Sequence, residues 1–303
     1  MDSKQVHLLS VRNLSVAFGG VRVTDNVSFS ISSGEIFAIM GESGCGKSVS
    51  AMAIPRLLPC PSAKIASGEI IFEGKNILEL NDMGQIRGSR IGCVFQEPMQ
   101  ALNPVVSIGT QLMESVRFMP KKNGAERIKQ LLDKSGFKDA ERILQSYPHE
   151  MSGGMLQRIV ICMALAPKPS LIIADEPTTA IDAKLQKSIM DTLKNLCQEE
   201  KTAILFITHN AHLAASYANR IAVMYAGQIV ECGAAKEVFN SPKHPYTKAL
   251  LKVVPEKGKT LKDLKAIPGS VPSPKDFDDG CRFRFRCEFA KKECERVGEC
   301  ILL

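Results

Sequence analysis

The stretch GESGCGKS, Gly41 to Ser48, constrains this chain more than any other feature of its sequence. It fits the pattern G-x-x-x-x-G-K-[ST] and lies between an apolar run, Glu35 to Met40, and a segment with helical spacing through Leu57. Glycines at these positions let backbone N–H groups surround phosphate oxygens, and the next helix directs its positive end at them. Lys47 would neutralise the β- and γ-phosphates, and the Ser48 hydroxyl would ligate Mg²⁺. The stretch therefore predicts a strand–loop–helix unit that binds a nucleoside triphosphate.

A second motif, LIIADEP, places two carboxylates after an apolar strand. Asp175 falls at the carboxyl end of that strand, where open α/β sheets hold their ligands, and would hold Mg²⁺. Glu176 can orient or deprotonate an attacking water. Gln96 and His209 also follow predicted strands. Each alone would be an ordinary polar loop residue, but beside a phosphate loop both become candidates for sensing the γ-phosphate.

The pattern of the whole chain indicates an α/β fold. The runs LIIAD and AILFIT are continuously apolar, as in strands buried on both faces of a parallel sheet. The region between Phe95 and Leu171 has helical spacing, and after Gly233 repeated prolines interrupt the chain. Further strands are predicted at Val6 to Val11, Val27 to Ile31, Gly68 to Phe72, Ile91 to Phe95, Leu171 to Ala174, Ala203 to Ile207 and Ile221 to Tyr225, and helices at Ala125 to Ser135, Ala140 to Gln145 and from Ser152.

The stretch MSGGMLQR repeats the chemistry of an anion site. Ser152, Gly153 and Gly154 offer backbone N–H groups without bulky side chains at the start of a predicted helix. Since GESGCGKS already surrounds the chain's own phosphates, this second loop is expected to contact ATP held by another subunit, in a two-fold pair that encloses two nucleotides. The alternative is a serine N-cap followed by structurally neutral glycines.

With these motifs in this order, the sequence resembles the ATP-binding-cassette (ABC) ATPases over essentially its whole length. GESGCGKS, Gln96, SGGM, LIIADEP, TTAID and His209 match that family's Walker A, Q-loop, signature, Walker B, D-loop and H-switch. The resemblance implies a P-loop nucleotide-binding domain over residues 1–236, with a mixed sheet core and a helical subdomain at about 97–168. It also implies a Cys-rich extension over 237–303.

The resemblance assigns roles to the matching residues. ATP would be held by Phe18, Gly41, Ser43, Gly44, Cys45, Gly46, Lys47 and Ser48, with Phe18 stacking on adenine and Val23 as a weaker alternative. Glu176, His209 and Gln96 would be catalytic, and Ser48, Gln96 and Asp175 would hold Mg²⁺. Ser152, Gly153, Gly154 and Met155 would contact the partner's ATP, and Asp182 would lie at the dimer seam.

Other stretches point to one branch of the family. Met155 in the signature, FQEPMQALNP, YPHEMSGGM and HPYTKALLKVVP look like the dipeptide, oligopeptide and nickel importer ATPases, and the cargo is left open between peptides and nickel or its chelates. The D-loop reads AID where LD is usual. The branch implies a second, related ATPase as partner, two transmembrane permease subunits and an extracytoplasmic substrate-binding protein.

Composition sets the remaining expectations. No stretch reaches the roughly 18 apolar residues of a membrane helix, and no secretory signal is visible, so we expect a peripheral protein at the cytoplasmic face of the membrane. The net charge of +7 is mild, and no nucleic-acid partner is expected. The alternative function is a soluble ABC ATPase acting on nucleic acid or ribosomes. Such proteins commonly carry two cassettes or a long coiled-coil insert, and neither is visible.

Four cysteines are crowded near the C-terminus. Cys281, Cys287, Cys294 and Cys300 follow the spacing C-x5-C-x6-C-x5-C, wider than the pairs typical of structural zinc sites. A reducing compartment disfavours disulfides, and four thiolates suit an iron–sulfur cluster or zinc. Resemblance to the peptide-importer branch favours a [4Fe–4S] cluster with zinc as the alternative, and makes Cys300 the least secure ligand. The other interpretation is four reduced, solvent-facing thiols that bind no metal.

Overall fold

A computed structural model describes residues 7–178, 182–252 and 267–296 of the chain. The chain divides into two compact units. The first unit comprises Met1–Ser32, Ile36–Leu80 and Phe206–Leu303, and the second comprises Ser33–Glu35 and Asn81–Leu205. GESGCGKS and the cysteine-bearing segment thus belong to the first unit, and SGGM and LIIADEP to the second.

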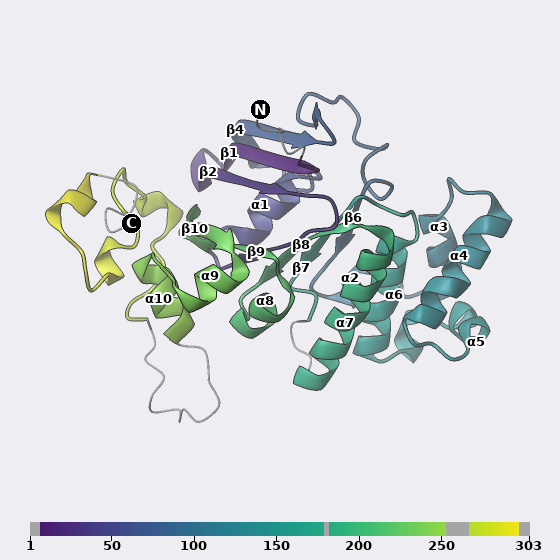
Figure 1. Cartoon of the computed structure of the whole chain (residues 1–303). Coiled ribbons are helices and arrows are strands. Elements are labelled where there is room, and N and C mark those ends of the chain that lie inside the picture. Colours follow the sequence, from purple (N-terminus) through teal and green to yellow (C-terminus); the bar gives the residue numbers. More distant parts are fainter. Residues whose placement is uncertain (1–6, 179–181, 253–266, 297–303) are drawn as a thin grey trace, which may run out of the picture. The chain divides into compact units, whose positions relative to one another are not determined.

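An antiparallel sheet in the first unit has the strand order β2-β1-β4-β5 (Figure 1). Its strands are β1 (Leu9–Phe18), β2 (Val21–Ile31), β4 (Ala63–Phe72) and β5 (Lys75–Asn76). Val27, Phe29 and Ile31 of β2 are buried, and the residues between them are not, as expected for a sheet with one face on the core. This alternation fixes the pairing of β2 with β1, because a slip by one residue would expose the apolar side chains.

A second set of strands in the first unit carries the phosphate loop. β3 (Ile36–Met40) pairs in parallel with β9 (Arg220–Tyr225), and β9 pairs antiparallel with β10 (Gln228–Ala234). β8 (Ala203–Thr208) is wholly buried and runs across the boundary between the units in sequence. The helices of this unit are α1 (Lys47–Ala53), α8 (Ala211–Tyr217), α9 (Ala235–Asn240) and α10 (Pro245–Lys252), and the segment 267–296 contains 3₁₀ turns at Pro274–Asp276, Arg284–Arg286 and Lys292–Glu295.

The second unit is largely helical. Two parallel strands, β6 (Ile91–Val94) and β7 (Leu171–Asp175), lie beside each other. The helices are α2 (Pro98–Ala101), α3 (Ile108–Ser115), α4 (Lys121–Lys134), α5 (Ala140–Gln145), α6 (Gly153–Leu165) and α7 (Ala183–Glu200). Buried residues on α6, among them Leu156, Ile159 and Val160, form the centre against which α3, α4 and α7 pack.

Most predicted elements are present, with different ends. The strand predicted at Val6 to Val11 begins at Leu9 and continues to Phe18, and the one predicted from Gly68 begins at Ala63. The helix after the phosphate loop ends at Ala53 and not at Leu57. Pro55 has no N–H to continue the helical hydrogen bonds, and Arg56 adopts a left-handed φ of 56°.

Within the described ranges, no helix combines the length and apolar character needed to cross a membrane.

Candidate functional site

The phosphate-type loop follows the fully buried strand β3. Lys47 is 5% exposed, and its Nζ donates hydrogen bonds to the backbone oxygens of Gly41 and Glu42, each at 2.9 Å. Gly46 caps α1 with a φ of 100°, which a residue with a Cβ rarely adopts. A Cβ on Gly41 would lie 2.2 Å from the carbonyl oxygen of Met224. Both glycines are therefore required by the loop's own geometry.

The residues of the phosphate loop differ in their exposure to solvent. Ser43, Gly44 and Ser48 are exposed, whereas Cys45 is fully buried. Burial raises the pKa of the Cys45 thiol, against the opposing effect of the Lys47 ammonium. Cys45 is thus a neutral packing residue, and the surface available to an anion is formed by its neighbours.

The other predicted residues of the first unit lie at strand ends or edges. Phe18 ends β1, half-buried, and pairs with Val21 and Ala63. The backbone oxygen of Val23 lies within contact distance of the Cβ position of Gly46, so Val23 borders the phosphate loop directly. His209 is exposed and follows β8.

In the second unit, two neighbouring parallel strands end at the predicted polar residues. Val94 of β6 pairs with Ala174 of β7, so Gln96 and Asp175 leave the same edge of this strand pair. The Cys93 thiol has a pKa raised to about 12 by burial and by the Asp175 carboxylate. Glu176 adopts a φ of 45°, an unusual value for a residue other than glycine and one that is found preferentially at functional sites.

The two glycines of the second glycine loop, Gly153 and Gly154, differ in what surrounds them. Ser152 caps α6, and its Oγ accepts a hydrogen bond from the Met155 N–H at 3.4 Å. A Cβ on Gly154 would approach Leu185 of α7 to 2.7 Å, so this glycine serves the packing of the unit. A Cβ on Gly153 would meet nothing within 4 Å, and Ser152 and Gly153 are exposed. The fold of the chain itself gives no reason for a glycine at position 153.

Asp182 caps α7, and its Oδ1 accepts a hydrogen bond from the Leu185 N–H at 3.0 Å. Its carboxylate is exposed at the helix start. Its predicted neighbours in TTAID at positions 179–181 lie outside the described residues.

The donor chemistry of Ser48, Gln96 and Asp175 fits Mg²⁺. A hydroxyl, an amide oxygen and a carboxylate are hard oxygen donors of the type that Mg²⁺ prefers. Asp175 is half-buried, and Ser48 and Gln96 are exposed.

The described residues of the cysteine segment do not form a metal centre as placed. In the part of the chain that the structure describes, no group of three or more His, Cys, Asp or Glu side chains is placed to hold a metal ion. Cys294 is 7% exposed, and Cys281 and Cys287 are half-buried. The backbone N–H groups of Phe289 and Lys291 donate to the Sγ atoms of Cys287 and Cys294, at 3.4 and 3.5 Å. Cys300 lies outside the described residues.

Three residues at the phosphate loop were missed by the sequence analysis. Glu42 is a variable position of the loop pattern, and Tyr246 and Arg286 lie far away in sequence. The Glu42 N–H donates to Tyr246 Oη at 3.0 Å, and the Glu42 carboxylate accepts two hydrogen bonds from Arg286. The acidic residue inside an anion-binding loop was the available indication, because its charge is unfavourable beside an anion unless a cation lies nearby.

Comparison with known proteins identifies two regions. Residues 24–179 match the family model described as "ABC transporter", and residues 230–294 match "Oligopeptide/dipeptide transporter, C-terminal region". A probable peptide ABC transporter ATP-binding protein, y4tR of Sinorhizobium fredii, is 45% identical over 95% of this chain and 89% of its own length. The oligopeptide transport ATP-binding protein AppD of Bacillus subtilis is 43% identical over 95% of this chain and 90% of its own length.

Solved structures give the same fold. CbiO1 from Clostridium perfringens, part of the transporter complex cbiONQ, aligns with a TM-score of 0.69 at 28% identity, over 78% of this chain and 91% of its own. The cassette MJ0796, in a dimeric post-hydrolysis state bound to ADP and Pi, aligns with a TM-score of 0.65 at 28% identity, over 75% and 98% of the two chains.

Proposed function

Because the chain belongs to the ABC transporter ATPases, we propose that it is the ATP-hydrolysing subunit of an importer whose cargo is peptides. The match of residues 230–294 to the C-terminal region of oligopeptide and dipeptide transporters carries this proposal. The relatives compared above are named for peptides, which favours peptides over nickel or its chelates. The same C-terminal match disfavours a soluble ATPase acting on nucleic acid or ribosomes.

For ATP binding, we propose that the exposed loop residues Ser43, Gly44 and Ser48 face the phosphates, together with the Lys47 ammonium. Mg²⁺, held by Ser48, Gln96 and Asp175, would supply positive charge to the β- and γ-phosphate oxygens. Phe18 or Val23 would contact the base. Two observations support this proposal. Lys47 binds the backbone of its own loop, and the loop geometry requires glycine at positions 41 and 46. The three proposed metal ligands also offer oxygen atoms of the type that Mg²⁺ prefers.

For hydrolysis, we propose that Glu176 positions the attacking water and that His209 and Gln96 contact the γ-phosphate side. The unusual backbone of Glu176 supports a functional role, because a φ of 45° is costly unless the surrounding structure maintains it. Asp182 would lie at the seam between two such chains.

We further propose that Ser152, Gly153, Gly154 and Met155 face ATP bound to a second ATPase subunit. The support is Gly153, whose missing Cβ leaves open space at a helix N-terminus that can approach an anion. On this proposal the two-fold pair would have one such loop over each of two nucleotides. The branch favours a related but different ATPase as the partner.

The domain limits proposed for this function are an ATPase domain at 1–236, with a helical subdomain at about 97–168, and a C-terminal extension at 237–303. The importer would contain two permease subunits and an extracytoplasmic substrate-binding protein, with this chain at the cytoplasmic face of the membrane.

A groove of about 290 Å³ in the second unit supports permease docking. It is lined by Phe95 and Phe118, which are 39% and 70% exposed, and by Met163 and Arg117.

For the cysteine segment, we propose metal ligation by Cys281, Cys287, Cys294 and Cys300, with a [4Fe–4S] cluster favoured over zinc. The N–H donors at two of the sulfur atoms support it, because thiolate ligands commonly accept such hydrogen bonds. The described side chains would have to move together, since they form no such group as placed. Anaerobically purified full-length chain should be brown and contain iron, whereas stoichiometric zinc in a colourless sample would reverse the assignment.

The experiment that tests the proposed function is Glu176→Gln in the full-length chain with its partner subunits. We expect ATP to bind normally, turnover to fall by at least about a hundredfold, and an ATP-bound dimer to accumulate. Phosphate release and size-exclusion chromatography with light scattering measure the two effects. Glu141→Gln is the control, because that carboxylate is exposed on α5. Unchanged hydrolysis in Glu176→Gln would remove Glu176 from the mechanism.

A further inference from the structure

Arg286 is a buried cation whose hydrogen-bonding capacity is fully used. It is 9% exposed, and each of the five N–H groups of a guanidinium has an acceptor here. Nε donates to Pro268 O at 2.7 Å, Nη1 to Glu42 Oε2 at 2.8 Å and Tyr225 Oη at 3.4 Å, and Nη2 to Glu42 Oε1 at 3.0 Å and Ile267 O at 3.3 Å. Burial alone would lower the pKa of Arg286, but the hydrogen bonds to Glu42 and Tyr225 raise it above its ordinary value. The guanidinium is therefore permanently charged.

The carboxylate that Arg286 holds is part of the phosphate loop. Glu42 directly follows Gly41, its backbone oxygen accepts from Lys47 Nζ, and its N–H donates to Tyr246 Oη. The two residues of the ion pair are 244 positions apart, and both belong to the first unit. The fork-to-fork geometry fixes the direction of the carboxylate as well as its charge. Glu42 is thus held through its side chain, its N–H and its carbonyl.

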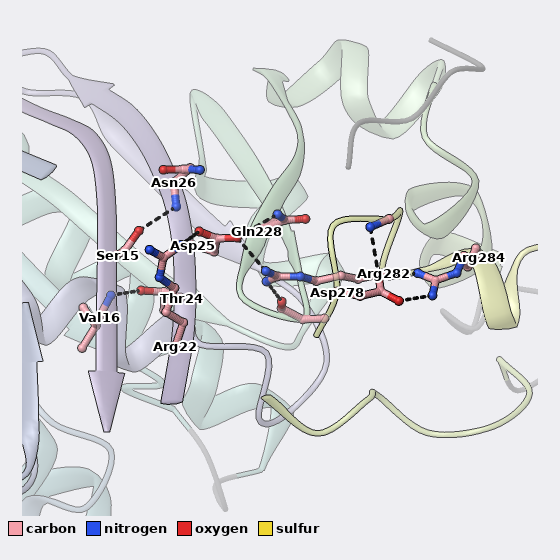
Figure 2. Close-up of polar contacts among 12 residues, drawn as sticks. Ser15, Val16, Arg22, Thr24, Asp25, Asn26, Gln228, Asp278, Arg282 and Arg284 are labelled. Atoms are coloured by element: carbon pink, nitrogen blue, oxygen red, sulfur yellow. Dashed lines mark hydrogen bonds and ion pairs between the residues drawn. The ribbon is translucent and has the colours of Figure 1, made fainter. Parts of the chain in front are cut away.

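A second arginine of the same segment, Arg282, contacts two elements that adjoin the phosphate loop. Figure 2 shows Arg282 extending from the C-terminal segment to Asp25 of β2 and to the turn between β9 and β10. Its Nη2 donates to Asp25 Oδ2 and its Nη1 to Ala226 O, each at 2.6 Å. The next residue, Gly227, donates its N–H to Cys45 O of the phosphate loop at 2.9 Å. The guanidinium also lies 4.0 Å from the ring centroid of Phe277.

Aromatic packing joins these contacts into one surface. The Phe283 ring lies edge-on to Tyr225 and Tyr246, with centroids 5.1 and 5.3 Å away, and all three rings are buried. Tyr225 ends β9, and Tyr246 is in the first turn of α10. Phe283 lies between Arg282 and Arg286 in the chain. The segment is therefore held by apolar packing of the Phe283 ring and by an ion pair on either side of it in sequence.

From this geometry we propose that Arg286 is a positioning residue of the ATP site, acting through Glu42. It neutralises the one carboxylate in GESGCGKS and fixes the start of the loop, so that the segment 267–296 forms part of the nucleotide-binding structure. Without it, the negative charge of Glu42 would stand beside the binding place of a polyanion. This inference rests on the proposed binding of MgATP at Gly41 to Ser48.

The test is steady-state ATP hydrolysis by the assembled transporter with Arg286→Gln in the full-length chain. We expect the KM for MgATP to rise about tenfold, in the range of couplings measured for contacting charged groups, with kcat within about twofold of wild type. Arg286→Lys keeps the charge but loses the fork and should give a smaller rise in KM. It also serves as the test variant should Arg286→Gln not fold, as judged by circular dichroism.

A double-mutant cycle separates this role from general stabilisation. Glu42→Gln removes the charge that Arg286 neutralises, so adding Arg286→Gln to it should change KM by no more than about twofold. Arg284→Gln is the matched control, since Arg284 lies in the same segment and pairs with Asp278. Its KM should equal that of wild type.

Two results would overturn the inference: a wild-type KM in both Arg286 variants, or the same rise in KM whether position 42 carries Glu or Gln. Failure of the proposed function gives a different pattern, because wild type and Arg284→Gln would then also lack ATP hydrolysis.

Discussion

At the scale of single residues, two glycines near helix starts show the difference between a structural and a functional requirement. Gly109 lies in the first turn of α3, where a Cβ would come within 2.5 Å of the backbone oxygen of Leu144. Gly153 lies in the first turn of α6 and faces open space. Only Gly109 is therefore explained by the packing of the second unit.

Gly153→Ala should leave the folded chain intact and impair the assembled ATPase. The free energy of unfolding should change by less than about 1 kcal/mol, since alanine is the better helix former. ATP hydrolysis should fall roughly tenfold or more, because a methyl group displaces a closely placed phosphate. Thermal unfolding and phosphate release measure the two effects, and wild-type turnover would count against the second loop facing a partner's ATP.

Gly109→Ala is the matched change with the opposite pattern. It should lower the free energy of unfolding by about 2 kcal/mol, since the backbone around Leu144 must shift. Turnover per folded molecule should stay near wild type.

A third residue, His244, should make stability depend on pH. It is 3% exposed, and burial lowers its pKa to about 4, against the opposing charge of Glu231. Its Nδ1 accepts a hydrogen bond from the Tyr246 N–H at 3.1 Å. Between pH 6.5 and 4 the unfolded chain binds a proton at this residue and the folded chain does not. Lowering the pH through this range should therefore decrease the free energy of unfolding by on the order of 2 kcal/mol.

The measurement is chemical unfolding of wild type and His244→Asn from pH 7.5 to 4.5. The Asn Oδ1 can accept the same hydrogen bond and does not titrate. The pH dependence due to His244 is the difference between the two curves, since other acidic groups contribute to both. Parallel curves would show that His244 does not titrate as inferred.

At the scale of elements, the sequence predicted what short contiguous patterns determine. β3, the loop and α1 were predicted together because an apolar run, a glycine pattern and helical spacing adjoin. The helix α7 was not predicted, although Asp182 as N-cap and the buried Ile189, Leu193 and Leu196 on one face were available in the sequence. The early end of α1 was also readable from Pro55.

Contacts between distant elements could not be read in this way. Glu42 lies between β3 and α1, and Arg286 lies in a 3₁₀ turn of the C-terminal segment. Neither residue has a periodicity or spacing that indicates the other, and only the folded first unit brings them together. The same holds for Asp25 of β2 and Arg282 (Figure 2).

At the scale of the whole molecule, the chain combines two regions that match two different family models. Residues 24–179 match ABC transporters in general, whereas 230–294 match oligopeptide and dipeptide transporters. The sequence predicted both, because each depends on local motifs such as LIIADEP and HPYTKALL. It did not predict that the second region contacts the loop GESGCGKS of the first through Glu42, so exchanging C-terminal regions between relatives would also change the support of that loop.

The lysine of the phosphate loop has a consequence for anion binding. Its ammonium lies on two carbonyl oxygens of the same loop, those of Gly41 and Glu42. An ammonium has three N–H donors, so a bound phosphate oxygen can accept from the third while these two carbonyl oxygens keep the ammonium in place. The place of this positive charge is therefore set by the backbone of the loop itself, and an arriving anion can use it without rearranging the lysine side chain.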